Sequence, residues 1–144
     1  MRGMTTLIRL AQFEVDEQRS DLGRIVQARS DAATALSSHD SAVARETDIP
    51  RTEAGDFAAL SAWIAQSARA RARLQQRYAE LNRTEAAARE SLTSAIAQAK
   101  RLQLAHESAQ STTRQIRVHR SELRADEREV ARHTAARTPV HEPA

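Results

Sequence analysis

Apolar residues recur at every seventh position through more than half of the chain. One register begins at Leu60 and contains no charged residue: Leu60, Ser67, Leu74, Leu81, Ala88, Ala95, Leu102, Ala109, Ile116, Leu123 and Val130. A repeat with a mean spacing of 3.5 residues keeps one stripe of a helix turned toward a partner helix, as in coiled coils. The pattern therefore predicts a long helix that packs on another helix.

A second register lies between the members of the first and changes along the chain. It is apolar at Phe57 and Ile64 and becomes polar further on, at residues such as Arg71, Glu85 and Arg120. The first third of the chain has a heptad of its own: Ile8, Val15, Leu22, Arg29, Leu36 and Val43. Its companion positions are weaker: Ala11, Gln18, Ile25, Ala32 and His39. We therefore expect two helices joined along a narrow seam.

Helix breakers fix the predicted boundaries. Thr5 or Thr6 is suited to cap a first helix, and Pro50 stops that helix because proline lacks an amide donor and restricts its predecessor. Asp56 follows Gly55 as the predicted N-cap of a second helix. The predicted segments are a flexible N-terminus (1–4), a first helix (5–47), a turn (48–56), a second helix (57–134) and a disordered tail (135–144).

A short connection between two heptad-bearing helices favours an antiparallel hairpin. The predicted fold is thus all-α, a two-helix coiled-coil hairpin with a longer second helix. At 1.5 Å per residue the two helices are about 63 and 117 Å long, so the first covers its partner only to about residue 100. Beyond that point the stripe from Leu102 to Val130 has no partner in the chain. We expect this overhang to bind another protein, since a helix so poor in apolar residues is marginal alone.

Composition agrees with an elongated helical protein. The 144 residues include one Trp, one Tyr, two Phe and no Cys, and the net charge is only +3. A thick globular core and a disulfide or thiolate-metal framework are therefore excluded, while the low net charge argues against disorder. The chain has no apolar run of about 20 residues and no signal-peptide pattern at its start, which predicts a cytoplasmic protein without a transmembrane segment.

Charge differs between the two predicted arms. Residues 1–50 have a net charge of −2 and residues 51–144 one of +5. A row of arginines follows the overhang at steps of three or four: Arg114, Arg117, Arg120, Arg124 and Arg128. This row is either a solvated face balanced by nearby carboxylates or a contact line for acidic loops of a partner. No nucleic acid is expected, because interspersed carboxylates repel phosphates and aromatic stacking platforms are missing.

The sequence offers little for catalysis. The five histidines include no pair at i, i+4 and no cysteine that would complete a metal site. Three scattered glycines form no phosphate-binding loop, and Ser37 and Ser38 beside His39 lie on a helix that offers no pocket. We expect a non-enzyme without cofactor or metal.

Three segments resemble the FliJ family of bacterial flagellar export proteins. They are Leu7–Arg19 (LIRLAQFEVDEQR), Asp56–Ile64 (DFAALSAWI) and the long charged second helix. The resemblance covers roughly residues 4–135. It implies an antiparallel two-helix coiled coil, similar to the central stalk of rotary ATPases, in the pore of the hexameric flagellar export ATPase. It also implies a link to the export gate membrane protein, escort of export chaperones, and a place at the cytoplasmic side of the inner membrane at the flagellar base.

Two sets of candidate contacts accompany this resemblance. The candidate ATPase contacts are Ile8, Val15, Ile116, Arg117, Arg120, Leu123, Arg124 and Val130. The candidate gate contacts are Phe57, Leu60 and Ile64, which match in type the aromatic and spaced aliphatic residues of the family's pattern, while Ser67 and Arg71 match its polar end only loosely. Two alternatives stay open at this point: the stalk of a virulence type III secretion system, and a self-assembling coiled-coil scaffold.

Overall fold

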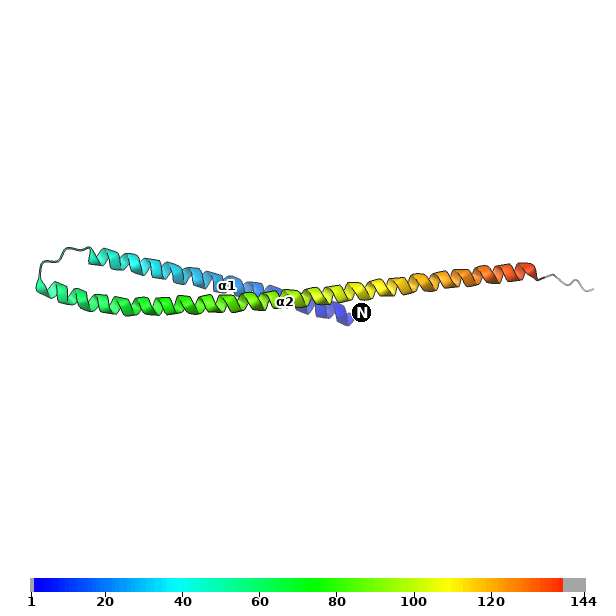
Figure 1. Cartoon of the computed structure of the whole chain (residues 1–144), viewed down its shortest axis with the longest axis horizontal. Helices are drawn as coiled ribbons and strands as arrows, with labels where there is room; N and C mark the ends of the chain where they lie inside the picture. Colours follow the sequence, from blue (N-terminus) through cyan, green and yellow to red (C-terminus); the bar gives the residue numbers. More distant parts are fainter. Residues whose placement is uncertain (1, 139–144) are drawn as a thin grey trace, which may run out of the picture. The chain divides into compact units, whose positions relative to one another are not determined.

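The computed structural model describes residues 2–138, which form two helices and no strand (Figure 1). Helix α1 spans Arg2–Thr47 and helix α2 spans Ala54–Arg137. The two helices pack as a hairpin, which confirms the predicted all-α fold with a longer second helix. Within the described range, neither helix contains a stretch that is long and apolar enough to cross a bilayer.

Helix α1 begins earlier than predicted. Arg2, Gly3 and Met4 are helical, so the expectation of a flexible segment at these positions is wrong. Thr6 does not cap the helix, because its hydroxyl Oγ1 donates a 3.1 Å hydrogen bond to the carbonyl oxygen of Arg2. This back-bond to residue i−4 is typical of threonine inside a helix, so Thr6 lies within α1 and not at its start.

The connection between the helices is held by its own side chains. The Thr47 hydroxyl and the Asp48 amide donate hydrogen bonds to carbonyl oxygens of the last turn of α1. The Arg51 guanidinium donates to the carbonyl oxygen of Glu46 (3.0 Å), an acceptor that the end of α1 leaves free, and to that of Ile49 (3.2 Å) in the connection. Pro50 lies outside both helices, as predicted.

Helix α2 is longer than predicted at both ends. It begins at Ala54, so Asp56 lies in the first turn and is not the N-cap. Its amide donates to the Glu53 carbonyl oxygen at 3.2 Å, and its carboxylate is placed favourably for the helix dipole. Residues 135–137, predicted to be disordered, are helical. Thr138 follows the helix, and its hydroxyl donates a 2.9 Å hydrogen bond to the Thr134 carbonyl oxygen. Residues 139–144 of the predicted tail lie outside the described residues.

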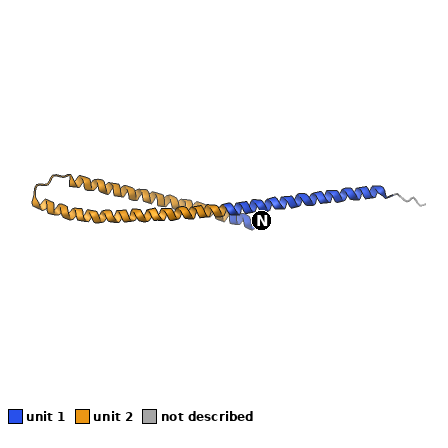
Figure 2. Cartoon of the chain, viewed as in Figure 1, with its two compact units in different colours: residues 1–8, 100–144 blue, residues 9–99 orange. Residues whose placement is uncertain are grey.

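The chain divides into two compact units (Figure 2). Unit 2, residues 9–99, contains the paired arms of the hairpin. Its most buried residues are Val15 and Leu81, each 8 % exposed, and Glu85, 5 % exposed. Shielded residues alternate at steps of three and four along α1, in the order Ala11, Val15, Gln18, Leu22, Ile25, Arg29, Ala32, Leu36, His39 and Val43. This is the alternation that both predicted registers of the first helix require.

Unit 1 comprises residues 1–8 and 100–144. Here Met4 and Ile8 on α1, and Leu102, His106 and Thr113 on α2, are half-buried. The expected limit of coverage near residue 100 is therefore too early, because α1 starts at Arg2 and the connection is short. Every residue from 114 to 138 is exposed. We refer to residues 114–137 as the C-terminal segment.

Candidate partner-binding surface

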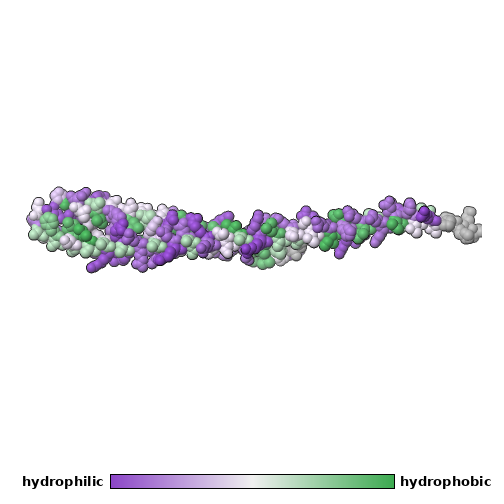
Figure 3. Space-filling view, in the orientation of Figure 1, coloured by the Kyte–Doolittle hydropathy of each residue, from purple (hydrophilic) through white to green (hydrophobic). Residues whose placement is uncertain are grey.

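The C-terminal segment carries an exposed apolar stripe. Ile116, Leu123 and Val130 are spaced by seven residues and are 47, 48 and 65 % exposed. Residues at this spacing lie on one face of a helix. In Figure 3 apolar patches interrupt the hydrophilic surface along this part of α2. The stripe thus has the geometry of a coiled-coil seam without its second helix.

A basic ridge borders this stripe. Arg120, Arg124, Arg128 and Arg132 follow one another at steps of four, and Arg114 and Arg117 precede them at steps of three. Among residues 2–138, none of these guanidinium groups takes part in an ion pair or side-chain hydrogen bond. No arginine and carboxylate lie four residues apart in this segment, and the oppositely charged residues three apart, Arg124 with Glu127 and Glu129 with Arg132, form no ion pair among the described residues. The charges of the segment are therefore available to a partner.

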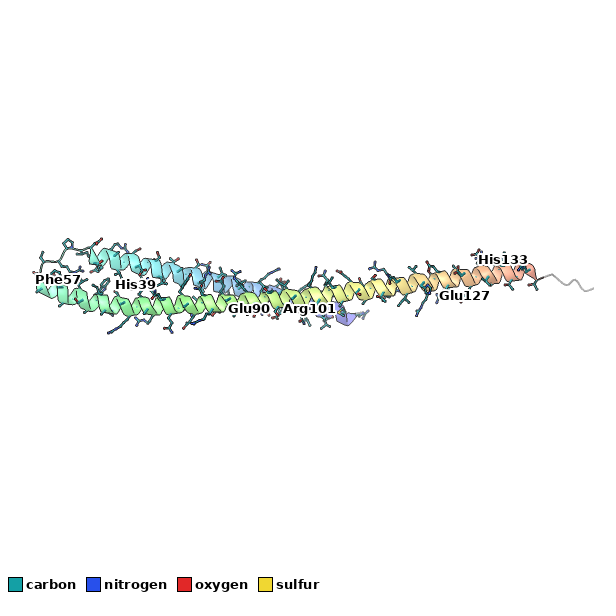
Figure 4. The ribbon with its side chains drawn as sticks, in the orientation of Figure 1. His39, Phe57, Glu90, Arg101, Glu127 and His133 are labelled. Carbon is teal, nitrogen blue, oxygen red and sulfur yellow. The ribbon has the colours of Figure 1, made fainter. Side chains whose placement is uncertain are left out.

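The hollows on the surface of the C-terminal segment are open and shallow. One hollow of about 340 Å³ lies along Arg114, Val118 and Glu122, and another of about 500 Å³ lies along Val130 and His133. Figure 4 shows Glu127 and His133 projecting from this part of the helix. No group of three or more His, Cys, Asp or Glu in the described part of the chain could hold a metal ion. A convex helical surface of this kind suits a groove or a second helix on another protein.

Two of the candidate ATPase contacts lie in the seam of the hairpin. Val15 is 8 % exposed, and Ile8 is half-buried. Their side chains pack between the helices and are not presented to another protein. The other candidate ATPase contacts are exposed and lie on the C-terminal segment: Ile116, Arg117, Arg120, Leu123, Arg124 and Val130.

The candidate gate contacts lie at the start of α2. Phe57, at the beginning of α2 in Figure 4, is 55 % exposed. Ile64 is 43 % exposed, whereas Leu60 is half-buried. Leu60 and Trp63 line an open hollow of about 330 Å³ together with Glu46, Arg51, Asp56 and Ala59. The three candidates are therefore divided: Phe57 and Ile64 are accessible to a partner, and Leu60 forms part of the wall of the hollow.

A buried carboxylate links the two helices in the middle of unit 2. Glu85 Oε2 lies 2.9 Å from Arg29 Nη1 on the facing helix, an ion pair whose N–H is not aligned for a hydrogen bond. Its other oxygen, Oε1, accepts hydrogen bonds from Arg89 Nε (3.0 Å) and Nη2 (2.8 Å), one turn further along α2. A charge buried between helices is tolerated when it is paired in this way.

A second ion pair crosses the seam nearer the connection. Arg71 Nε and Nη2 donate to Asp40 Oδ1 and Oδ2 at 2.7 and 3.1 Å, a bidentate arrangement. The pKa of Asp40 is lowered below its usual range, mainly because Arg71 donates these hydrogen bonds to the carboxylate. The pKa of Arg71 is correspondingly raised, mainly because Asp40 accepts them.

Sequence reasoning did not find these cross-helix pairs. The signal was present, because Arg29 is the one charged member of the first helix's heptad, and Arg71 and Glu85 are charged members of the second register of the longer helix. In an antiparallel hairpin the residue numbers of facing positions have a nearly constant sum. The sums for the Asp40–Arg71 and Arg29–Glu85 contacts differ by three, so Glu85 lies within one helical turn of the position that the first pairing predicts opposite Arg29.

No protein-family model, curated protein or solved structure matches this chain.

Proposed function

We propose that this chain is a non-enzymatic stalk or adaptor of the bacterial flagellar type III protein export apparatus. In this role it binds the hexameric export ATPase, couples it to the export gate and escorts export chaperones at the cytoplasmic face of the inner membrane. The proposal rests on the resemblance of three segments to the FliJ family and on a hairpin fold of the kind that the resemblance implies.

One observation carries the assignment of the ATPase contact. The C-terminal segment has an apolar stripe at heptad spacing and a basic ridge, and its residues remain exposed throughout. Burying Ile116, Leu123 and Val130 against a partner would contribute about 25 cal/mol per Å² of apolar surface removed from water. The arginines would add salt-dependent contacts to acidic loops. We assign this segment as the part that contacts the ATPase.

The accessible residues at the start of α2 are the proposed gate contacts. Phe57 is an exposed aromatic, and large apolar side chains of this type are frequent anchors of protein interfaces. Ile64 lies seven residues further on and is also exposed. These two residues thus retain the surface position that a gate contact requires.

The ATPase contact is tested by placing charge in the stripe. The double variant Ile116→Asp with Leu123→Asp should lose binding to the purified export ATPase in a pull-down and should no longer stimulate ATP hydrolysis. The matched control is Leu104→Asp, which alters a residue of α2 that is 52 % exposed but lies outside the stripe. Circular dichroism checks that both variants remain helical. Unchanged ATPase binding by a helical double variant would refute the assignment.

A further inference from the structure

A second exposed apolar face lies near the beginning of α1, within unit 2. Leu10 and Phe13 are 60 and 61 % exposed, although both are large apolar residues. Glu14, Glu17 and Asp21 follow Leu10 at four, seven and eleven residues, which places them on the same side of the helix. We call these five residues the acidic face of α1. It borders the seam, whose neighbouring members are Ala11, Val15 and Gln18, and its member Asp21 is half-buried.

The charges of this face are only partly satisfied within the chain. Glu14 accepts a 2.9 Å hydrogen bond from the neutral Gln18 side chain, and Asp21 forms an ion pair with Arg24. Glu17 has no hydrogen bond or ion pair among residues 2–138. Over the eight residues 14–21 the net charge is −3, from four carboxylates and one arginine.

The C-terminal segment offers the opposite pattern at the same length. The eight residues 114–121 contain three arginines and no carboxylate, a net charge of +3. They include Ile116 of the apolar stripe, and Leu123 follows two residues later. Each surface therefore combines exposed apolar side chains with about two helical turns of one charge, and the two charges are equal and opposite.

We propose that two copies of this chain associate through these surfaces, with the acidic face of α1 from one copy on the C-terminal segment of the other. Leu10 and Phe13 would pack against the stripe at Ile116 and Leu123, while Glu14 and Glu17 would bind the arginines of the ridge. The occupant is a second copy, because each surface exposes large apolar side chains and the net charge of −3 over residues 14–21 complements that of +3 over residues 114–121.

This association would use the same side of α2 as the proposed ATPase contact. Self-association and ATPase binding would then exclude one another, so that the paired form holds the ATPase-binding surface covered until the ATPase displaces the second copy. The self-association does not rest on the proposed function, since it is measured on the isolated protein.

Charge exchange between two variants tests the proposal. The full chain is studied by sedimentation velocity over a range of concentrations at low and high salt. Wild type should show a larger species at low salt that is lost at high salt. The variant Glu14→Arg with Glu17→Arg should be monomeric because two basic surfaces then meet, and Arg117→Glu with Arg120→Glu should be monomeric because two acidic surfaces meet. An equimolar mixture of these variants should restore the larger species, since every pairing between unlike copies joins opposite charges.

The matched control for the Glu14 and Glu17 variant is Glu90→Arg with Glu107→Arg, which makes the same change in net charge at exposed positions outside both surfaces. It should sediment as wild type does, and circular dichroism should show that all variants stay helical. A wild-type protein that is monomeric at every concentration would overturn the proposal. So would a larger species that survives either charge reversal, or a mixture that remains monomeric. ATPase pull-downs with the same variants report separately on the proposed function, because Glu14 and Glu17 lie outside the proposed ATPase contact.

Discussion

Leu81 and Leu123 belong to the same heptad register of one helix, yet they have different environments. Leu81, in the paired arms of the hairpin, is 8 % exposed, and Leu123, in the C-terminal segment, is 48 % exposed. Their local sequences both specify a helix with an apolar stripe. The difference is the presence of α1 beside one and not beside the other. The pattern thus determines where a helix can bury surface, and a partner determines whether it does.

The charged members of the other register show the same difference. Arg71 and Glu85 are paired with residues of α1, whereas Arg120 and Glu127, which hold equivalent positions in the C-terminal segment, are unpaired among the described residues. In the hairpin a charge in the register has a partner across the seam. In the C-terminal segment it has none, and for this reason we interpret that segment as an interface.

Truncating Leu81 and Leu123 to alanine should give the largest difference in stability between the two regions. Leu81→Ala removes apolar contacts from a shielded position of the seam and should lower the free energy of unfolding by about 2 kcal/mol. Leu123→Ala changes an exposed residue and should have an effect within about 0.5 kcal/mol. Urea unfolding followed by circular dichroism measures both. Equal losses would mean that the isolated protein already covers the C-terminal segment.

The sequence predicted the helices and their seam well, because a heptad repeat is a local signal that one partner helix suffices to satisfy. It was less successful at the helix ends. Thr6 and Asp56 have the side chains of caps, but Thr6 bonds back to Arg2 inside the helix and Asp56 sits in the first turn. The cap residue and the first-turn residue share the same chemistry, so propensity does not separate them.

The candidate surface was also predicted in part. The position of Pro50 in the sequence indicates that the second helix is longer than the first. The exposure of Ile116, Leu123 and Val130 follows from this difference in length. The burial of Val15 follows from the same heptad and makes it a seam residue and not a contact for another protein. Arg51 was missed altogether, because its hydrogen bonds to the end of α1 depend on how the connection turns.

The Glu85 carboxylate should give the next largest effect. In Glu85→Gln the shape is kept and the charge is removed, so Arg29 faces the seam without its counter-ion and the free energy of unfolding should fall by about 1 to 2 kcal/mol. The control is Glu90→Gln, an exposed carboxylate without a partner among residues 2–138, and it should be nearly neutral. Urea unfolding distinguishes the two. A loss no larger than that of the control would show that the buried pair adds nothing to stability.

Replacing both Arg29 and Glu85 by leucine tests whether this ion pair fixes the alignment of the two helices, apart from its effect on the free energy of unfolding. The double variant should be at least as stable as Glu85→Gln, because an apolar pair needs no counter-ion. A slip by one heptad, which in the wild type sets Glu85 against Leu22 or Leu36, would then no longer bury a lone charge. Spin labels at Ser20→Cys and Ser91→Cys, both exposed positions of unit 2, should report a broadened distance distribution, since one heptad displaces the helices by about 10 Å. A single unchanged distance would assign the register to the apolar residues alone.

The smallest effect is expected at the Asp40–Arg71 pair, where both side chains are nearly half exposed. Because the pKa of Asp40 is lowered in the folded protein, its contribution to stability is present above the ordinary value of 3.8 and is lost as the pH falls through the lowered pKa. Asp40→Asn should therefore be slightly less stable than wild type near neutral pH and equal to it in strong acid. The difference near neutral pH should also shrink at high salt, since exposed pairs are screened. Urea midpoints of the two proteins along a pH series measure this. A difference that persists below the lowered pKa would place the effect of the substitution in packing and not in the charge of the pair.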